Sequence, residues 1–162
     1  MKKIVILVAS SNKNAELADA VRDEAQKLGH RLDLINLEDL DLPLYTADKE
    51  KAGIPPQLKS LQESMYQAES LIVLGPEYNG LIAPSLNNAI AWLSVADEDW
   101  RKGFNGKPTM IGTHSGGGGG RALIAMRLQL SYVGANVIGR EILTTYQKKL
   151  NLDSVRECLK QL

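Results

Sequence analysis

Hydrophobic and polar residues follow two alternating periods along this chain. Residues 4–8 (IVILV) are continuously apolar, which is typical of a strand buried on both faces of a parallel sheet. The apolar residues from Leu17 to Leu28 recur at helical spacing, and Gly29 is placed to end that helix. Residues 31–37 then alternate between apolar and polar, as expected of a strand nearer the sheet edge. The chain therefore begins with a strand, a helix and a second strand.

The same alternation continues after a polar, proline-containing segment at residues 38–54, which predicts a loop. Pro55 and Pro56 mark a second helical start and Pro84 lies near a third, because proline is tolerated in the first turn of a helix. Further strands are predicted at residues 71–74, 109–113 and 135–138, and further helices at residues 58–65, 86–93, 123–133 and 155–162. The pattern predicts one doubly wound α/β domain over residues 1–162, with five parallel strands in the order 2-1-3-4-5 and three α/β/α layers.

Composition narrows the class of protein. The 162 residues are close to the ordinary length of one domain, and 44% of them are apolar. Lys and Arg together number 19, as do Asp and Glu, and this neutrality argues against a nucleic-acid partner. No apolar run approaches the ~18 residues of a membrane span, so no membrane association is expected. The single cysteine, Cys158, cannot form an intrachain disulfide, which favours a reducing, cytoplasmic location.

The fold indicates where a ligand binds. In a doubly wound sheet, ligands lie beyond the carboxyl ends of the strands, where the strand order reverses. For the predicted order this point falls between the first and third strands. The segments that follow the first, third and fourth strands are residues 9–14, 75–81 and 113–120, which we refer to as the first, second and third loops. These three loops are the predicted site.

The first loop reads ASSNKN and leads into a helix. Its hydroxyls, amides and lysine, together with the free backbone N–H groups of a helix N-terminus, favour an anion. The simpler alternative is that Ser and Asn only cap the helix. The loop lacks the G-x-x-x-x-G-K-[ST] of a P-loop and the G-x-G-x-x-G of a dinucleotide fingerprint, which argues against a nucleoside triphosphate or a tightly bound NAD.

The second loop contains GPEYNG, and the third contains THSGGGGG. Asn79 and Gly80 permit a turn with positive φ, and Tyr78 offers a planar surface for a flat heterocycle. In the third loop, five consecutive glycines let the backbone approach a ligand closely, and His114 and Ser115 remain as polar groups. The alternatives are an ordinary Asn-Gly turn and a flexible linker.

The chain offers few residues for acid–base or metal chemistry. It has no G-x-S-x-G or H-E-x-x-H motif, and His30 and His114 are its two histidines. We therefore expect no metal and no catalytic side chain. Loops suited to a phosphate and a ring, with few acid–base groups beside them, suggest that a bound cofactor carries the chemistry.

Several longer stretches match a known family. They are LPLY at residues 42–45, LIVLGPEYNG at 71–80, PSLNNAIAWL at 84–93 and the stretch RALIAMRLQL at 121–130. With them the sequence resembles the NAD(P)H-dependent FMN reductases, flavodoxin-like proteins that include quinone, azo-dye and chromate reductases. The resemblance implies a flavodoxin-like fold, non-covalently bound FMN, and NADPH or NADH as co-substrate. It also implies hydride transfer through the flavin to a quinone, an azo compound, free flavin or a similar acceptor.

The resemblance also assigns site residues by position. The FMN phosphate would be held by Ser10, Ser11, Asn12, Lys13 and Asn14, the isoalloxazine and ribityl chain by Pro76, Glu77, Tyr78, Asn79 and Gly80, and the other edge of the ring by His114, Ser115, Gly116 and Gly117. One departure concerns the first loop, which in relatives has the longer form G-S-x-R-x-x-S-x-N. This chain has Ala9 for the glycine and lacks the arginine, and Lys13 is its substitute cation.

Assembly and alternative functions follow from the same likeness. The family resemblance implies a homodimer, or a tetramer made of two such dimers, through the helix after Pro84, with Trp92 at the interface. One alternative function is a flavodoxin-like electron carrier, and another is a non-catalytic FMN-binding or regulatory module. Electron-carrying flavodoxins are usually strongly acidic, so the zero net charge argues against the carrier.

Overall fold

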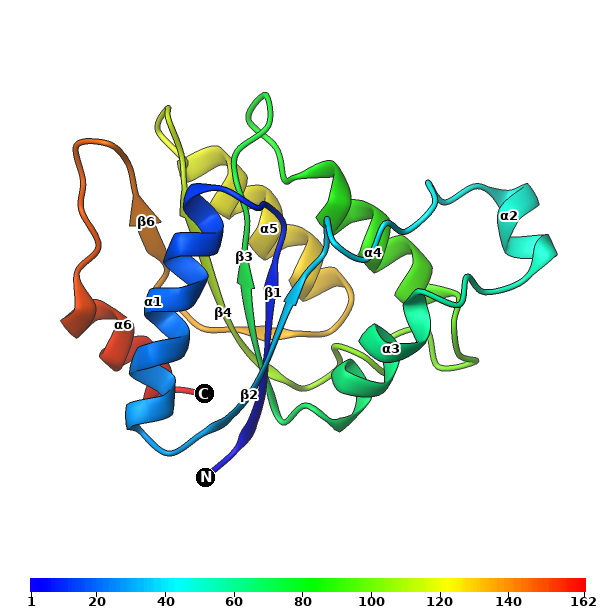
Figure 1. Cartoon of the computed structure of the whole chain (residues 1–162), viewed down its shortest axis with the longest axis horizontal. Coiled ribbons are helices and arrows are strands. Elements are labelled where there is room, and N and C mark those ends of the chain that lie inside the picture. Colours follow the sequence, from blue (N-terminus) through cyan, green and yellow to red (C-terminus); the bar gives the residue numbers. More distant parts are fainter.

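A parallel sheet forms the centre of the computed structural model, which describes residues 1–162 (Figure 1). Its strands are β1 (Lys3–Val8), β2 (Arg31–Asn36), β3 (Ser70–Leu74), β4 (Pro108–His114), β5 (Asn136–Val137) and β6 (Ile142–Thr144). They are arranged in the order β2-β1-β3-β4-β5, every pair is parallel, and β6 also pairs with β4. The predicted order 2-1-3-4-5 is confirmed.

Helices cover both faces of the sheet. α1 (Lys13–Lys27) and α6 (Leu152–Leu159) pack on one face, and α3 (Leu58–Gln67), α4 (Pro84–Ser94) and α5 (Gly120–Tyr132) pack on the other (Figure 1). Side chains alternate along β1, so Ile4 and Ile6 join the core beneath α1 and α6 while Val5 joins the larger core on the opposite face. The three predicted α/β/α layers are thus present.

The fifth position of the sheet differs from the prediction of one strand at residues 135–138. β5 is only two residues long, and the chain then leaves the ladder and returns as β6 beside β4, so the sheet has six strands rather than five. The guanidinium of Arg127 stabilises the segment between β5 and β6, where the chain leaves the sheet. It donates to the carbonyls of Val137 at 3.3 Å and Ile138 at 2.8 Å, and to the carboxylate of Glu141 at 3.0 Å.

Residues 38–54 contain a short helix that the polar composition did not predict. α2 (Ala47–Ala52) begins after Thr46, whose hydroxyl accepts from the backbone N–H of Lys49 at 3.2 Å. None of its side chains is buried, and it projects away from the rest of the molecule at the right of Figure 1. A helix with no apolar face leaves no periodic signal in the sequence.

The LPLY stretch is fastened to α4. The indole N–H of Trp92 donates to the carbonyl of Pro43 at 2.7 Å, and the amide of Asn88 donates to the same carbonyl at 3.1 Å. The rings of Tyr45 and Trp92 meet edge to face, with centroids 5.3 Å apart. Trp92 is fully buried by these contacts. The prediction that Trp92 lies at a subunit interface is therefore wrong, because its side chain is completely covered by other residues of the same monomer.

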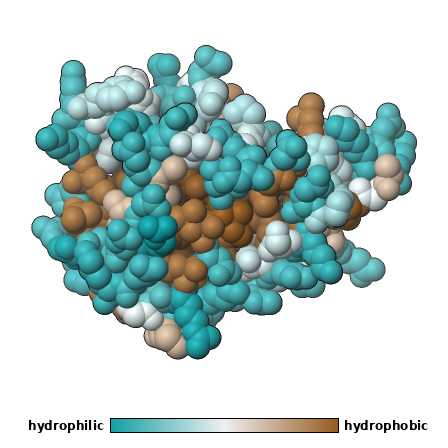
Figure 2. Space-filling model, in the orientation of Figure 1, coloured by the Kyte–Doolittle hydropathy of each residue, from teal (hydrophilic) through white to brown (hydrophobic).

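The exposed edge of the sheet carries apolar side chains. β2 is an edge strand in which Leu32, Leu34 and Ile35 are only half-buried. Figure 2 shows a band of hydrophobic surface across the middle of the face on which Figure 1 places this strand. None of the helices combines the length and the apolar stretch needed to cross a membrane.

Candidate functional site

Four segments meet at the carboxyl edge of the sheet. The first, second and third loops follow β1, β3 and β4, and all lie at the top of Figure 1. Residues 145–151, which connect β6 to α6 and which we call the fourth loop, rise at the same end of the molecule. The three predicted loops are thus brought together, and a fourth joins them.

The side-chain amide of Asn14 joins the first loop to the third. Asn14 is buried, its Nδ2 donates to the backbone carbonyl of His114 at 3.0 Å, and its Oδ1 accepts from the backbone N–H of His114 at 2.7 Å. Both polar ends of this side chain are therefore occupied within the protein. The backbone N–H of Asn14, at the start of α1, has no acceptor in the protein and is the part of this residue that can meet a ligand.

Glu77 joins the second loop to the third. Its Oε2 accepts from the hydroxyl of Ser115 at 2.8 Å and from the backbone N–H of Gly119 at 2.9 Å. Ser115 Oγ in turn accepts from the backbone N–H of Gly117 at 3.0 Å. One carboxylate thus holds the glycine run at two points, so the run is no free linker. The side chains of Glu77 and Ser115 shape the loop, and both are engaged within the protein.

Gly119 is the glycine of the run that no other residue can replace without strain. Its φ is 72°, and a Cβ there would lie 2.4 Å from Leu143 Cδ1 and 3.0 Å from Thr113 Cγ2. By contrast, Gly116 and Gly118 are exposed, and their N–H groups donate to no protein atom. The middle of the run therefore presents bare backbone donors to the outside.

Residues 78–81 of the second loop form a two-residue hairpin turn. The N–H of Tyr78 donates to the carbonyl of Leu81 at 3.0 Å, and the N–H of Leu81 donates back at 2.9 Å. Asn79 and Gly80 have φ of 51° and 80°, which is typical of a type I′ turn built on Asn-Gly. The predicted positive-φ turn is confirmed. It leaves Tyr78 48% exposed.

The first loop offers backbone donors and also holds a carboxylate. The N–H groups of Ser10 and Lys13 donate to no protein atom, and the helix dipole of α1 adds a partial positive charge there. Asn12 is at the N-cap position, yet its side chain makes no cap hydrogen bond. Glu38 Oε2 accepts from both the N–H and the hydroxyl of Ser11 at 2.8 Å. The donors of Ser11 are therefore already paired with an anion.

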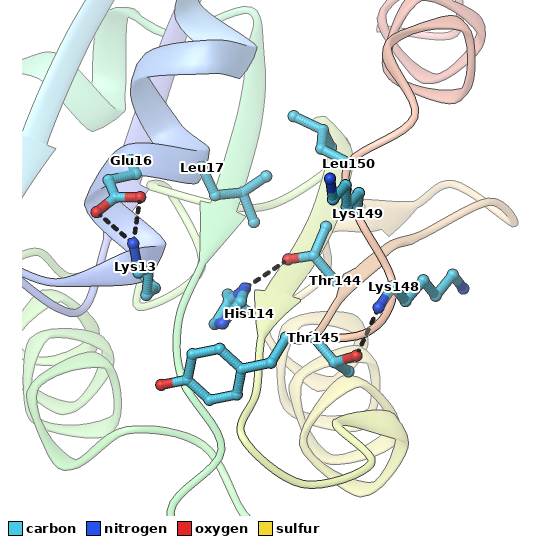
Figure 3. Close-up of a pocket in the computed structure, with 10 residues that line it drawn as sticks. Lys13, Glu16, Leu17, His114, Thr144, Thr145, Lys148, Lys149 and Leu150 are labelled. Atoms are coloured by element: carbon cyan, nitrogen blue, oxygen red, sulfur yellow. Dashed lines mark hydrogen bonds and ion pairs between the residues drawn. The ribbon is translucent and has the colours of Figure 1, made fainter.

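A hollow of about 470 Å³ separates the start of α1 from the fourth loop (Figure 3). We call it the lysine pocket. Its lining residues are Lys13, Glu16, Leu17, His114, Thr144, Thr145, Tyr146, Lys148, Lys149 and Leu150. The ammonium of Lys13 lies 2.8 Å from both carboxylate oxygens of Glu16, and this hydrogen-bonded pair raises the pKa of Lys13 above its ordinary value. The pocket shares Lys13 and His114 with the predicted site.

The residues at this edge that escaped the sequence argument include Glu38, Thr144, Tyr146, Lys148 and Lys149. Glu38 follows the second strand, and in the order 2-1-3-4-5 that strand is next to the first, so its proximity to the first loop could have been inferred. The other four depend on β6, which at three residues is too short to stand out from a loop. The ring of Tyr146 meets that of His114 edge to face at 5.2 Å.

The strand order and the donor-rich loops at its carboxyl edge define a flavodoxin-like α/β protein. A family model described as NADPH-dependent FMN reductase matches residues 2–149. The chain therefore belongs to the NADPH-dependent FMN reductase family, and the resemblance of its motifs is confirmed.

Individual relatives agree with this placement. Over 103 residues the chain is 36% identical to a quinone reductase of Escherichia coli, a match that covers 62% of this chain and 53% of that protein, about half of its length. Over 138 residues it is 32% identical to an NAD(P)H-dependent FMN reductase of Pseudomonas aeruginosa, which covers 78% of this chain and 73% of that one.

A solved structure supports the fold. FerB from Paracoccus denitrificans, described as a flavoenzyme NAD(P)H:(acceptor) oxidoreductase, has a TM-score of 0.79 at 21% identity, over 99% of this chain and 97% of its own. At that identity the likeness shows the architecture, and the flavodoxin-like fold is confirmed.

Proposed function

We propose that this protein is an FMN-dependent NAD(P)H oxidoreductase that reduces a small-molecule acceptor such as a quinone, an azo compound or free flavin. Membership of the FMN reductase family supports the proposal. The observation that carries it is the arrangement of the loops. Unpaired N–H groups at the start of α1 suit a phosphate, while the exposed ring of Tyr78 and the bare backbone of Gly116 suit a flat heterocycle.

The residues fit the two ends of FMN in different ways. At the phosphate end, the N–H groups of Ser10, Lys13 and Asn14 are available, whereas the side chain of Asn14 is not. At the ring end, Glu77 fixes the third loop, so its free donors stand ready before the ligand arrives. The segments proposed to hold FMN are residues 10–14, 76–80 and 114–117.

The chemistry divides between cofactor and protein. FMN, when bound, supplies a carrier that accepts a hydride and passes reducing equivalents on. The backbone donors of the third loop would hold its ring edge, and the hairpin at Asn79 and Gly80 would present Tyr78 to it. We assign no side chain as a proton donor or acceptor. The protein's contribution is therefore positioning and fixed backbone dipoles.

The absorption spectrum of the purified protein, before and after addition of FMN, is the first test. We expect visible flavin bands, oxidation of NADPH or NADH with menadione as acceptor, and ping-pong kinetics from one site used by both substrates in turn. An FMN-loaded protein inert with both nucleotides would contradict the oxidoreductase and favour an electron carrier. A protein that stays colourless after FMN addition would instead favour a non-catalytic module.

Assembly and location are part of the proposal. We propose a homodimer, or a tetramer made of two such dimers, in which the start of α4 and the outer face of α5 pack against a second copy. A mostly apolar hollow of about 760 Å³ lies there, lined in part by Leu81, Pro84, Leu128 and Tyr132. Leu128 is 74% exposed in the monomer, and a partner subunit would remove this apolar surface from water. We propose a cytoplasmic location, supported by the unpaired Cys158.

A further inference from the structure

The chain contains two Asn-Gly pairs, Asn79-Gly80 and Asn105-Gly106, which the structure holds in different ways. In such a pair the backbone nitrogen of the glycine can attack the side-chain carboxamide of the asparagine, because glycine has no Cβ to obstruct the approach. Both asparagines are exposed, and each follows an aromatic residue. Sequence and exposure therefore favour the same chemistry at both pairs, and a difference in their reactivity must come from local structure.

Asn105-Gly106 is held at three points. The N–H of Asn105 donates to the carbonyl of Arg101 at 2.8 Å. The N–H of Gly106, which is the attacking group, donates to the carbonyl of Gly134 at 2.8 Å. The carbonyl of Gly106 accepts from Asn136 Nδ2 at 3.0 Å. The nitrogen of Gly106 is therefore engaged, and these contacts must open before it can react.

Asn79-Gly80 lacks contacts of that kind. The N–H groups of both residues donate to no protein atom, and both residues form the tip of the hairpin that follows β3 (Figure 1). The turn is closed by the two hydrogen bonds between Tyr78 and Leu81. Rotation about the Cα–C bond of Asn79 brings the nitrogen of Gly80 to the carboxamide. This rotation requires only local opening of the turn, which exposes no core.

We propose that Asn79 is a site of spontaneous covalent modification, at which the side-chain carboxamide becomes a carboxylate. The nitrogen of Gly80 loses its proton to solvent hydroxide and forms a bond to Cγ of Asn79, and the side-chain nitrogen leaves as ammonia. Water then opens the resulting succinimide at either carbonyl, which yields aspartate or isoaspartate. The net reaction consumes one water and releases one ammonia, and it involves neither an oxidant nor a reductant.

The product changes the hairpin that the proposed function assigns to the flavin ring. Both products add a negative charge, and isoaspartate also adds a methylene to the main chain between Tyr78 and Leu81. A two-residue turn depends on the exact length of its loop, so the longer main chain disrupts the two hydrogen bonds that position Tyr78. This consequence for the flavin rests on the proposed function, whereas the modification itself does not.

The test follows both Asn-Gly pairs of the unmodified protein in warm, mildly alkaline buffer. Samples are quenched and digested in acid, and mass spectrometry gives the fraction of each asparagine that is converted. We expect Asn79 to react about tenfold faster than Asn105, because the hydrogen bond of the attacking Gly106 nitrogen must break first. In urea, where neither pair is folded, the two rates should converge, which controls for sequence context.

The outcomes separate the modification from the proposed function. Equal rates in the folded protein, or a faster rate at Asn105, would overturn the proposed modification site. Saturation with FMN should slow the reaction at Asn79 and leave that at Asn105 unchanged, since a ring against the hairpin opposes its opening. If Asn79 reacts faster but FMN changes neither rate, the modification stands and the placement of the flavin at this hairpin fails.

Discussion

Asn14 and Glu38 decide what the first loop can offer a ligand. The side chain of Asn14 forms both of its hydrogen bonds with the backbone of His114. The carboxylate of Glu38 accepts from the N–H and the hydroxyl of Ser11. The sequence of the loop alone reveals neither contact. The strand order places Glu38 near the first loop, but it does not show which donors the carboxylate contacts. The loop sequence did indicate that backbone donors are available, because every helix N-terminus has N–H groups without a partner inside the helix.

Replacing Asn14 by alanine should weaken the whole edge of the sheet. The change leaves the partly buried N–H and carbonyl of His114 without these partners, which costs about 1–3 kcal/mol. We expect a lower midpoint of urea unfolding for Asn14→Ala. Asn12→Ala is the control, since Asn12 is exposed and its side chain makes no cap hydrogen bond. Equal midpoints for the two variants would show that the contact with His114 contributes nothing.

Removing the charge of Glu38 should strengthen FMN binding. A phosphate at the first loop meets the repulsion of this carboxylate, worth about 1 kcal/mol at 4 Å in water. Glu38→Gln should therefore lower the dissociation constant for FMN about fivefold and leave that for riboflavin unchanged. Asp39→Asn changes the neighbouring charge and serves as control. An unchanged FMN affinity in Glu38→Gln would place the phosphate away from Ser11.

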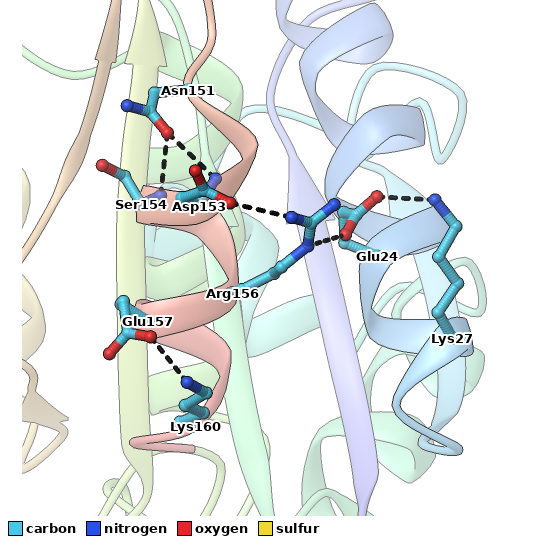
Figure 4. A network of polar contacts seen from close by, with 8 residues as sticks. All are labelled: Glu24, Lys27, Asn151, Asp153, Ser154, Arg156, Glu157 and Lys160. Carbon is cyan, nitrogen blue, oxygen red and sulfur yellow. Dashed lines mark hydrogen bonds and ion pairs between the residues drawn. The ribbon is translucent and has the colours of Figure 1, made fainter.

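At the scale of elements, α1 and α6 are held together by one buried carboxylate. Glu24 on α1 is 3% exposed, and its two oxygens lie 2.6 Å from the guanidinium Nε of Arg156 on α6 and 2.6 Å from the ammonium of Lys27 (Figure 4). Hydrogen bonds from Lys27 and Arg156 lower the pKa of Glu24 below its ordinary 4.5. Because the folded state favours the ionised form, this contribution to stability is present above the ordinary pKa and is lost as the pH falls.

The stability of Glu24→Gln should therefore differ from the unmodified protein in a pH-dependent way. At pH 7 we expect a lower midpoint of urea unfolding, and the deficit should shrink as the pH falls through the lowered pKa of Glu24, where the unmodified side chain takes up a proton. Glu157→Gln is the control, because its pair with Lys160 is exposed and contributes little. A deficit that is the same at pH 3 and pH 7 would contradict the ionic origin.

The elements were predictable in proportion to the core that they bury. β1 and β3 bury most of their residues and α4 buries one full face, and their apolar patterns gave their type and order. α2 buries nothing and left no pattern. β6 pairs with β4 through three residues, and the break before it is stabilised by polar contacts from Arg127 on the preceding helix α5. Hydrophobic periodicity arises from the buried face of an element, so it does not indicate elements that are stabilised by polar contacts alone.

At the scale of the molecule, the open apolar surface is concentrated on α5 and the segment before α4. Leu81 and Tyr132 line the hollow there and are 61% and 71% exposed. The sequence could indicate this surface only through the family resemblance. The amphipathic pattern of α5 shows which side chains face the core, and it does not show whether the outer ones meet water or a partner.

A charge at the centre of that surface should separate the proposed dimer. Leu128→Glu places a carboxylate in the hollow, where a second copy would have to desolvate it. We expect light scattering coupled to size-exclusion chromatography to give the mass of a dimer for the unmodified chain and of a monomer for this variant. Leu28→Glu, at the end of α1 on the other face of the sheet, should leave the mass unchanged. Identical masses for all three proteins would contradict an interface at α5.

The isolated position of α2 has a consequence for how the protein loses structure. Its first turn is capped by Thr46, and the hydroxyl of Tyr45 donates to the carboxylate of Glu50, but no side chain of the helix enters the core. Unfolding this helix exposes almost no apolar surface, so it costs far less free energy than opening the sheet. Residues 46–53 therefore form a separate unit of local stability. We expect their amide hydrogens to exchange with solvent through local opening of the helix. Those of β1 and β3 should exchange only when the whole molecule unfolds.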